Sequence, residues 1–539
     1  MPLRLLARGL ATSARAQKKA LLPAGWEAVI GIECHAQLTA PSKLFSATAP
    51  PALDTPQNTL AAPFDVAYPG TLPRLRDGVV DAALRAALAL ECTVAPRSTF
   101  DRKHYFYADL PAGYQITQQY SAYALTDPFA RDGSVRLRYA DGYLQSERDE
   151  LQVPVTRVQL EQDTAKTLHF ETGDGSSAQS FLDYNRAGVA LVEIVSAPVM
   201  NTPEHAGAYV RKLRELLRSV GASDGNMNEG SLRCDVNVSV RQTGGAHGVR
   251  CEIKNLNSVR FMMHAITYEV QRQFAIIQDG GVVEQESRGF DEARGTTFLM
   301  RGKADAPDYR YMPDPNIPAL LVSDERVGSI RDALPELPDA RHDRLRAQYG
   351  LSVRDVNVLT RINAEDDAVP QGGDAAPNAR IPHAVDYFER LVRLGAPAQA
   401  AVNWVAHDLL KQLNAASCAF VDNPVVPETL VELIAIVGDG TITAATGREL
   451  LAEMVKTRTM PASVRACVAE RGLERLATRE SLLPLCGAVA ADRPDDVAAI
   501  RGGRDKAVMR LVGEVMRRAG GRADAALAAE LLREVIARE

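Results

Sequence analysis

Short stretches in which apolar and polar residues alternate dominate the chain between residues 28 and about 322. In "AVIGIECHAQL", Ile32 and Cys34 alternate with Glu33 and His35. A period of two is typical of a β-strand that buries one face. The same alternation recurs in "VRLRYA", "VPVTRVQLEQ", "VALVEIVSAPV", "CDVNVSVR" and "VRCEIKNL". The pattern predicts a sheet with one apolar face and one polar face.

Two helices interrupt these strands with recognisable starting residues. Thr202 precedes a helical pattern over residues 203–220, and Ser258 precedes another over residues 259–278. Ser and Thr favour the N-cap position because their hydroxyl oxygen accepts a hydrogen bond from a free backbone N–H. Because strand–helix–strand alternations are few, we predict an α+β domain on a largely antiparallel sheet.

The pattern changes after Asp324. Proline turns lead into helical segments, and "NAEDDAVPQGGDAAPNARIP" then reads as a polar loop or linker. From residue 385 to the end, almost every segment is an amphipathic helix. We therefore predict three folded regions, at residues 26–325, 326–384 and 385–539, the last two all-α.

The first 25 residues differ from everything that follows. "MPLRLLARGLATSARAQKKALLPAGW" carries Arg and Lys with Ser and Thr, and contains no acidic residue before Glu27. An Arg-rich, acid-poor, amphipathic start is typical of a mitochondrial targeting segment, which places the protein in the matrix. A basic arm without a targeting role is the alternative.

Composition and charge exclude several classes of protein. The formal net charge of −6 excludes a uniformly basic nucleic-acid coat, so a polyanionic partner requires a local basic patch. The seven cysteines form no C-x-x-C pair, which argues against a disulfide scaffold and a zinc ribbon. No stretch supplies the roughly 18 apolar residues of a membrane helix, so we predict no membrane insertion.

Acidic residues occupy the predicted strands in a pattern that suggests a metal site. Glu33 and His35 share one strand face because residues two apart point the same way. Glu193 lies in the apolar run "VALVEIVSAP", where a charge is costly unless it is paired. Carboxylate oxygens converging from several strands would suit Mg²⁺. The alternative, that each acid lies on the solvated face of a half-exposed sheet, stays open for all of them except Glu193.

Several common nucleotide-binding and hydrolase motifs are missing. The chain has no G-x-x-x-x-G-K-[ST] loop, no G-x-G-x-x-G at a helix start, no H-E-x-x-H and no G-x-S-x-G. Any ATP must therefore bind without a P-loop. Arg310, in "DYRYMPDPNIPAL", lies between two tyrosines and could bind phosphate or form a structural ion pair.

Six motifs in a fixed order resemble one known family. They are "VIGIECHAQL", "KHYFYADLPAGYQITQ", "DYNRAGVALVEIVSAP", "GNMNEGSLRCDVNVSVR", "EIKNLNSVRF" and "DYRYMPDPNIP". From about residue 28 to its end, the chain resembles the GatB family, the B subunits of glutamyl-tRNA(Gln)/aspartyl-tRNA(Asn) amidotransferases, in a mitochondrial form. The resemblance implies a glutamine-synthetase-like cradle domain, followed by helical and tail domains that hold tRNA.

The resemblance also implies the activity, a carbon–nitrogen ligation with glutamine as amide donor. The family uses ATP and Mg²⁺ to phosphorylate the glutamyl carboxyl of Glu-tRNA(Gln), and ammonia then displaces the phosphate to give Gln-tRNA(Gln). The ammonia comes through a channel from a glutaminase, the amidase-type A subunit, in a heterotrimer with a small C- or F-type accessory subunit. An alternative is a tRNA-binding scaffold whose metal site is degenerate or structural.

Carried over motif by motif, the resemblance assigns roles to particular residues. The expected metal ligands are His35, Glu161, Glu193, Glu229, Asp235 and Glu252. The expected catalytic residues are Glu33, His35, Glu193, Arg186 and Arg233, and the expected nucleotide contacts are Lys254, Asn255 and Arg310. Basic residues of the tail are expected to contact tRNA: Arg504, Lys506, Arg510, Arg517, Arg518 and Arg522. For Arg186, Arg233, Lys254 and each tail arginine, a structural ion pair or a solvated helix face is the open alternative.

The chain departs from the family pattern at a few positions. Gln162 and Asn228 stand where relatives often carry a glutamate. These two departures are the only support for the scaffold alternative. The first of them also leaves open whether Glu161 or Gln162 faces the metal. "SKLFSATAPPALDTPQNTLAAPFDVAYPG" has no cysteine where some relatives bind zinc, so we expect no zinc.

Overall fold

The computed structural model describes residues 21–118, 128–171, 178–302, 309–362, 383–502 and 504–538. The chain divides into two compact units, with the boundary after Arg341. Residues 1–20 of the predicted targeting segment and the predicted linker at residues 363–382 lie outside the described residues. The boundaries of the targeting segment and of the three folded regions stay predictions.

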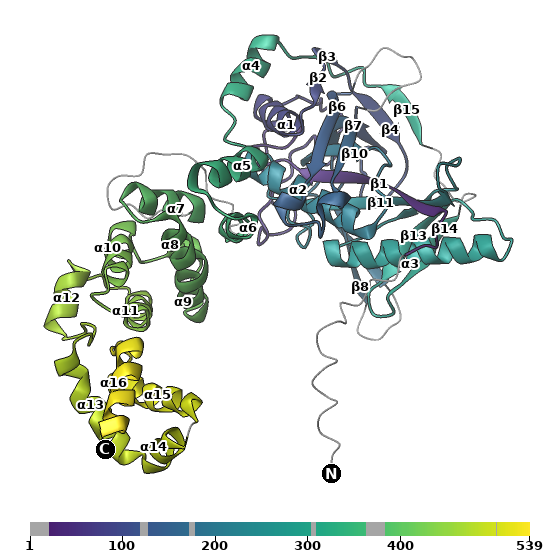
Figure 1. The fold of residues 1–539 in the computed structure, drawn as a ribbon. Helices are drawn as coiled ribbons and strands as arrows, with labels where there is room; N and C mark the ends of the chain where they lie inside the picture. The colour runs from purple at the N-terminus through teal and green to yellow at the C-terminus, as the bar shows by residue number, and fades with distance from the viewer. Residues whose placement is uncertain are drawn as a thin grey trace. The chain divides into compact units, whose positions relative to one another are not determined.

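A nine-stranded sheet forms the centre of the first unit (Figure 1). In spatial order its strands are β14 (Thr296–Gly302), β13 (Glu286–Asp291), β12 (Cys251–Ile253), β11 (Leu232–Gln242), β1 (Trp26–Gln37), β10 (Ala190–Ser196), β7 (Leu151–Gln162), β6 (Ala130–Leu137) and β2 (Thr93–Val94). Among these pairs, β12 and β13 run parallel and the others are antiparallel. The predicted α+β class with a largely antiparallel sheet is confirmed.

Three smaller sheets accompany the large one. They are β15 (Arg310–Pro313) with β4 (Asp101–His104) and β5 (Tyr114–Thr117), β16 (Leu320–Leu321) with β3 (Arg97–Ser98), and the hairpin of β8 (Lys166–Glu171) and β9 (Ala178–Asp183). The side chain of Gln115 on β5 donates to the backbone oxygen of Gln162 at 2.6 Å. This bond joins the three-stranded sheet to the end of β7.

The helices of the first unit are α1 (Asp77–Ala89), α2 (Pro203–Ser219), α3 (Val259–Gln278) and α4 (Asp324–Asp332), and α5 (Pro338–Tyr349) spans the boundary between the units. The two predicted N-caps are confirmed, since Thr202 accepts from the backbone N–H of His205 and Ser258 from that of Phe261. Short 3₁₀ turns occur at Tyr139–Asp141 and Glu147–Asp149.

The alternation on β1 places its two faces in different environments. Ile30, Ile32 and Cys34 are buried in one apolar core with Tyr209 and Leu213 of α2. Glu33 and His35 point to the opposite face, because successive side chains of a strand alternate. Burial of the apolar side chains against α2 therefore determines which face carries the acids.

The second unit is helical (Figure 1). Its helices are α6 (Val353–Arg361), α7 (Ala384–Arg393), α8 (Ala398–Asn403), α9 (Leu410–Ala415), α10 (Pro427–Gly438), α11 (Ala444–Thr457), α12 (Val464–Glu470), α13 (Arg479–Asp492), α14 (Pro494–Arg501), α15 (Val508–Arg518) and α16 (Ala525–Arg538). A π-helical turn at Trp404–Leu409 joins α8 to α9, and 3₁₀ turns occur at Phe420–Asp422 and Asp505–Ala507. One apolar core joins α6 through α12, and a second joins α13 through α16. No described helix has both the length and the apolar character needed to cross a membrane.

Candidate active site

The strand register brings the predicted acids onto one face of the large sheet. On β1, Glu33 lies opposite Asp235 of β11, and His35 lies opposite Glu193 of β10. Directly opposed residues of an antiparallel pair have their Cβ atoms about 5 Å apart on the same face. The four residues are therefore neighbours across three adjacent strands, although up to 202 positions of sequence separate them.

The next strand, β7, adds a further carboxylate to this face. Glu161 lies opposite Leu191, two residues from Glu193, so its side chain points to the same face as Glu193. Gln162 points the other way, and its backbone oxygen is bonded to Gln115. Glu161, and not Gln162, therefore lies on the face that carries His35 and Glu193, and its role as a metal ligand stays a prediction.

His35 lies at the centre of three carboxylates. Its Nε2 is 3.5 Å from Glu161 Oε1, 3.7 Å from Glu33 Oε1 and 3.8 Å from Glu193 Oε2. Ligand atoms of Glu33, His35 and Glu193 all lie within 4.8 Å of one another. Oxygen donors with one imidazole nitrogen suit Mg²⁺ or Mn²⁺ better than a softer metal. The residues present therefore fit a hard divalent cation, and we call Glu33, His35, Glu161 and Glu193 the acid cluster.

The carboxylates of this cluster are held in an unfavourable electrostatic environment. Burial and then repulsion by Glu161 raise the pKa of Glu193, although His35 and Arg157 oppose the rise. Burial and then repulsion by Glu193 likewise raise the pKa of Glu33. Removing an acid from water and surrounding it with like charges disfavours its ionised form. A bound cation would relieve this repulsion.

Asp235 and Glu252, whose roles as metal ligands stay predictions, form a second acidic group that one lysine partly neutralises. Lys254 Nζ lies 2.5 Å from Asp235 Oδ2 and 3.1 Å from Glu252 Oε1. Burial would lower the pKa of Lys254, but attraction by Asp235 and Glu252 outweighs it, so the pKa lies above the usual value. This lysine therefore stays charged and occupies the space between the two carboxylates.

Arg233 and Arg186 meet at one carboxylate, Asp163, which is not among the predicted site residues. Arg233 Nη2 lies 2.9 Å from Asp163 Oδ2, and Arg186 Nε lies 3.8 Å from the same oxygen. Arg186 also donates to the backbone oxygens of Thr164 and Ala165. Both arginines are thus fixed beside the end of β7, and each remains about one-third exposed, at 38% for Arg233 and 35% for Arg186.

Profiles of known protein families match most of the chain. The profile of the GatB/GatE catalytic domain matches residues 28–328, and that of the GatB domain matches residues 386–536. The chain belongs to the GatB family. It is 48% identical to the mitochondrial glutamyl-tRNA(Gln) amidotransferase B subunit of Mycosarcoma maydis, over 95% of this chain and 86% of that protein.

Two further relatives cover nearly the whole chain. The mitochondrial glutamyl-tRNA(Gln) amidotransferase B subunit of Laccaria bicolor is 43% identical, over 95% of this chain and 92% of its own. The aspartyl/glutamyl-tRNA(Asn/Gln) amidotransferase B subunit of Granulibacter bethesdensis is 40% identical, over 95% of this chain and 98% of its own. The family assignment made from the six motifs is confirmed, and the chain is a mitochondrial member of the GatB family.

Three further predicted site residues of this GatB family member also lie outside the acid cluster. Glu229 is exposed on the turn before β11, where its backbone N–H bonds Asn226. Asn255 is exposed just after β12 and adopts a left-handed φ of 61°. Arg310 lies on β15 of the small sheet, where its backbone oxygen contacts His104 Nδ1 at 3.1 Å. Their predicted roles stay predictions.

Sequence reasoning missed residues that surround the GatB acid cluster. Gln159 Nε2 donates to Glu193 Oε2 at 2.8 Å, and Arg157 Nη2 lies 3.5 Å from Glu193 Oε1. Both could have been found from the period of two, because they share the β7 face with Glu161. Lys103 also acts on Glu161 and Glu193, but it belongs to the separate three-stranded sheet. No pattern in the sequence near Lys103 predicts that this sheet lies near the acids.

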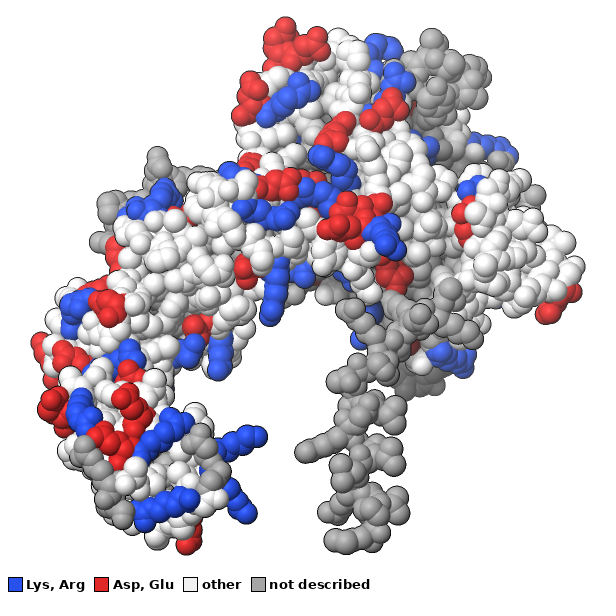
Figure 2. Space-filling view, viewed as in Figure 1, with Lys and Arg blue, Asp and Glu red and all other residues white. Residues whose placement is uncertain are grey.

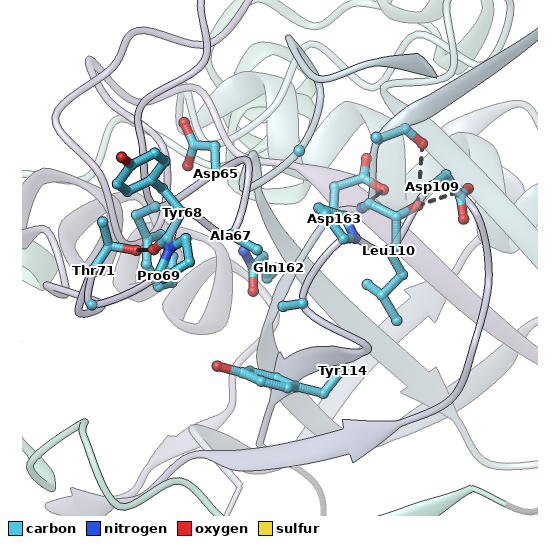
Figure 3. A pocket seen from close by; sticks show the side chains of 17 residues that line it. Asp65, Ala67, Tyr68, Pro69, Thr71, Asp109, Leu110, Tyr114, Gln162 and Asp163 are labelled. Carbon is cyan, nitrogen blue, oxygen red and sulfur yellow. Dashed lines mark hydrogen bonds between the residues drawn. The ribbon is translucent and has the colours of Figure 1, made fainter. Parts of the chain in front are cut away.

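A pocket of about 250 Å³ opens beside the end of β7 (Figure 3). Asp65, Asp109 and Asp163 line it, together with Tyr68, Tyr114 and Gln162. Asp65 is buried, and its Oδ2 accepts hydrogen bonds from Lys43 and Ser46. Two of these aspartates are therefore paired with basic side chains, Asp65 with Lys43 and Asp163 with the two arginines beside the acid cluster.

The predicted tRNA-contacting residues of the tail differ in how they are paired. Arg504 and Lys506 are exposed, whereas Arg510 contacts Asp496 at 2.9 Å. Arg517 and Arg518 both contact Glu514, and Arg522 donates to the backbone of Ala519. Figure 2 shows basic and acidic side chains interspersed over the helical unit. A tRNA role for these residues stays a prediction.

Proposed function

We propose that the acid cluster of the first unit is where this protein phosphorylates the glutamyl carboxyl of Glu-tRNA(Gln) and then amidates it. As a member of the GatB family, the chain acts in the tRNA-dependent conversion of Glu-tRNA(Gln) to Gln-tRNA(Gln) in mitochondria. The observation that supports the site is the meeting of Glu33, Glu161 and Glu193 around His35.

The cluster has the properties that an ATP-dependent carboxyl activation requires. Its carboxylates and imidazole would hold a divalent cation, which when bound neutralises charge on phosphate oxygens. Gln159 holds Glu193 in place through its amide, so the ligand atoms keep their positions. Gathering positioned charges in a partly buried site strengthens their effect, because little solvent reorganises during reaction.

The groups around the cluster have separate roles in this proposal. Lys254 pairs with Asp235 and Glu252 and borders the cluster on the β11 side. The proposed nucleotide contacts are Lys254, Asn255 and, on β15, Arg310. Arg233 and Arg186, fixed by Asp163, are the proposed contacts of the glutamyl carboxylate or the transferred phosphate. Glu229 is the proposed outer ligand that would have to move toward the metal.

The reaction also needs groups that other polypeptides supply. The chain is one member of a multi-subunit amidotransferase, because its relatives are named as B subunits of such enzymes. We assign the glutaminase to an amidase-type A subunit and propose a small C- or F-type subunit as the third member. The tail, with Arg504, Lys506, Arg510, Arg517, Arg518 and Arg522, is the proposed tRNA contact.

Substitution of Glu193 by Gln tests the proposal. This change removes one charge but keeps an oxygen that accepts from Gln159, so the fold should persist. In the reconstituted complex with its partner subunits, we expect about a 100-fold loss of Gln-tRNA(Gln) formation, because one carboxylate of the charge-stabilising set is gone. Glutaminase activity and tRNA binding should stay within twofold of wild type.

Glu292→Gln is the matched control, since Glu292 is exposed on the turn after β13. Asp235→Asn, which removes a partner of Lys254, should also reduce Gln-tRNA(Gln) formation. If both Glu193→Gln and Asp235→Asn keep full activity, the chain is a tRNA-binding scaffold with a structural or degenerate metal site.

A further inference from the structure

The ammonium group of Lys103 is a positive charge that reaches the acid cluster from a separate sheet. Lys103 lies on β4, opposite Gln115 of β5 and Tyr311 of β15. Gln115 bonds the backbone of Gln162, next to Glu161, so β5 and the β4 strand paired with it lie at the end of β7 that carries Glu161. Burial would lower the pKa of Lys103, but attraction, first by Glu161, raises it above its usual value.

Aromatic rings hold this ammonium in place. Lys103 Nζ lies 4.9 Å from the ring centre of Tyr309 and 5.9 Å from that of Tyr105. The two rings pack edge to face at 5.5 Å, and the Tyr105 hydroxyl donates to Gln115 at 3.2 Å. Attraction between a cation and an aromatic face positions the charge without using any of its hydrogen-bond donors.

Lys103 differs in this respect from the other cations around the site. Lys254 is bound to Asp235 and Glu252, and Arg233 is bound to Asp163. In the described ranges of the chain, the Lys103 ammonium has no carboxylate within 4.0 Å and no hydrogen-bond acceptor. Its three N–H groups are therefore free to bind an incoming anion.

We propose that Lys103 binds the γ-phosphoryl group of the nucleoside triphosphate while it is transferred to the substrate carboxylate. This inference rests on the proposed function of the acid cluster. A carboxylate oxygen of the substrate forms a bond to the γ-phosphorus, and the bond from that phosphorus to the β,γ-bridging oxygen breaks. The bridging oxygen leaves on ADP with the electron pair, and Lys103 neutralises charge on the transferring oxygens.

The position of Lys103 near Glu161 and Glu193 also predicts an effect on metal binding. A positive charge beside Glu161 and Glu193 repels any other cation that approaches those carboxylates. Removing the charge should therefore strengthen binding of a divalent metal when no nucleotide is present, whereas removing a structural residue would weaken it. The two effects of Lys103, on metal binding and on phosphoryl transfer, thus have opposite signs.

Lys103→Met, which keeps the length of the side chain but removes its charge, is the informative variant. In the reconstituted amidotransferase we expect kcat for Gln-tRNA(Gln) formation to fall about 100-fold. Without ATP, Mn²⁺ measured by titration calorimetry should bind roughly fivefold tighter. Lys103→Arg should recover part of kcat, and Lys166→Met, on the exposed part of β8, is the matched control with wild-type values.

Isotope exchange locates the step. With Glu-tRNA(Gln), with ATP labelled at the β,γ-bridging oxygen and with no amide donor, wild-type enzyme should scramble the label, and Lys103→Met should do so about 100-fold more slowly. Unchanged scrambling, unchanged kcat or weaker Mn²⁺ binding in this variant would each overturn the assignment of Lys103. If Glu193→Gln is inactive while Lys103→Met is fully active, only this inference fails, and if both are active the proposed function fails as well.

Discussion

Asp101 is a buried carboxylate whose ionisation should weaken the fold. It lies on β4 opposite Thr117, is 0% exposed, and neither of its oxygens has a hydrogen-bond partner among the described residues. Burial raises its pKa from 3.8 to about 6. A rise of about two units corresponds to about 3 kcal/mol of unfolding free energy at pH values above both pKa values.

The direction of the effect follows from the raised pKa. The folded state holds the proton more tightly, so the contribution of Asp101 to stability is complete below pH 3.8 and is lost as pH rises to about 6. Asp101→Asn replaces the acid by a neutral group of the same shape. We expect the variant to gain about 3 kcal/mol relative to wild type as pH is raised from about 4 to about 8.

Urea denaturation followed by tryptophan fluorescence measures this difference. The chain has two tryptophans, and Trp404→Phe would leave Trp26, which packs against Phe274 at 5.3 Å, as a reporter of the first unit. In that background we would compare Asp101→Asn with Asp54→Asn, which replaces an exposed acid. A pH-independent difference between Asp101→Asn and wild type would refute the reasoning.

Three further predictions concern metal binding, a close backbone approach and a buried ion pair. Mg²⁺ should raise the melting temperature of the first unit, and Glu193→Gln should abolish this shift in calorimetry. In EDTA at about pH 8, Glu193→Gln should be more stable than the wild-type protein, because the raised pKa of Glu193 makes its charge unfavourable. In urea denaturation, Gly188→Ala should lower the stability of the protein by about 2 kcal/mol more than Gly221→Ala. Both glycines have positive φ, but of the two only Gly188 lies where a Cβ would meet another group, Asp65 Oδ1 at 2.6 Å. Lys212→Met should cost about 3 kcal/mol by the same measurement. Lys212 is 2% exposed, and its loss removes the ammonium that Asp141 and Asp339 share, although Asp141 keeps Arg138. An equally stable variant would contradict this prediction.

Some elements of the fold could be predicted from short stretches of the sequence. The helix after Ser258 ends where predicted, at Gln278, because an N-cap hydroxyl and a run of helix-forming residues act within a few positions. Alternation on β1 separated Ile32 and Cys34 from Glu33 and His35 for a similar reason, since strand geometry turns each side chain opposite to its neighbour. These predictions needed no knowledge of distant residues.

The sequence by itself therefore determined the class of fold, the family and the face on which the acids would lie. Only the tertiary structure decided which acids meet, because pairing of β1 with β10 and β11 sets the register that places Glu193 beside His35. The positions of Lys254 and Lys103 also depend on the tertiary structure. Lys254 is paired through the neighbouring strand, whereas Lys103 reaches the cluster from another sheet. Contacts between distant strands depend on how buried surfaces pack, and no short stretch of sequence encodes that.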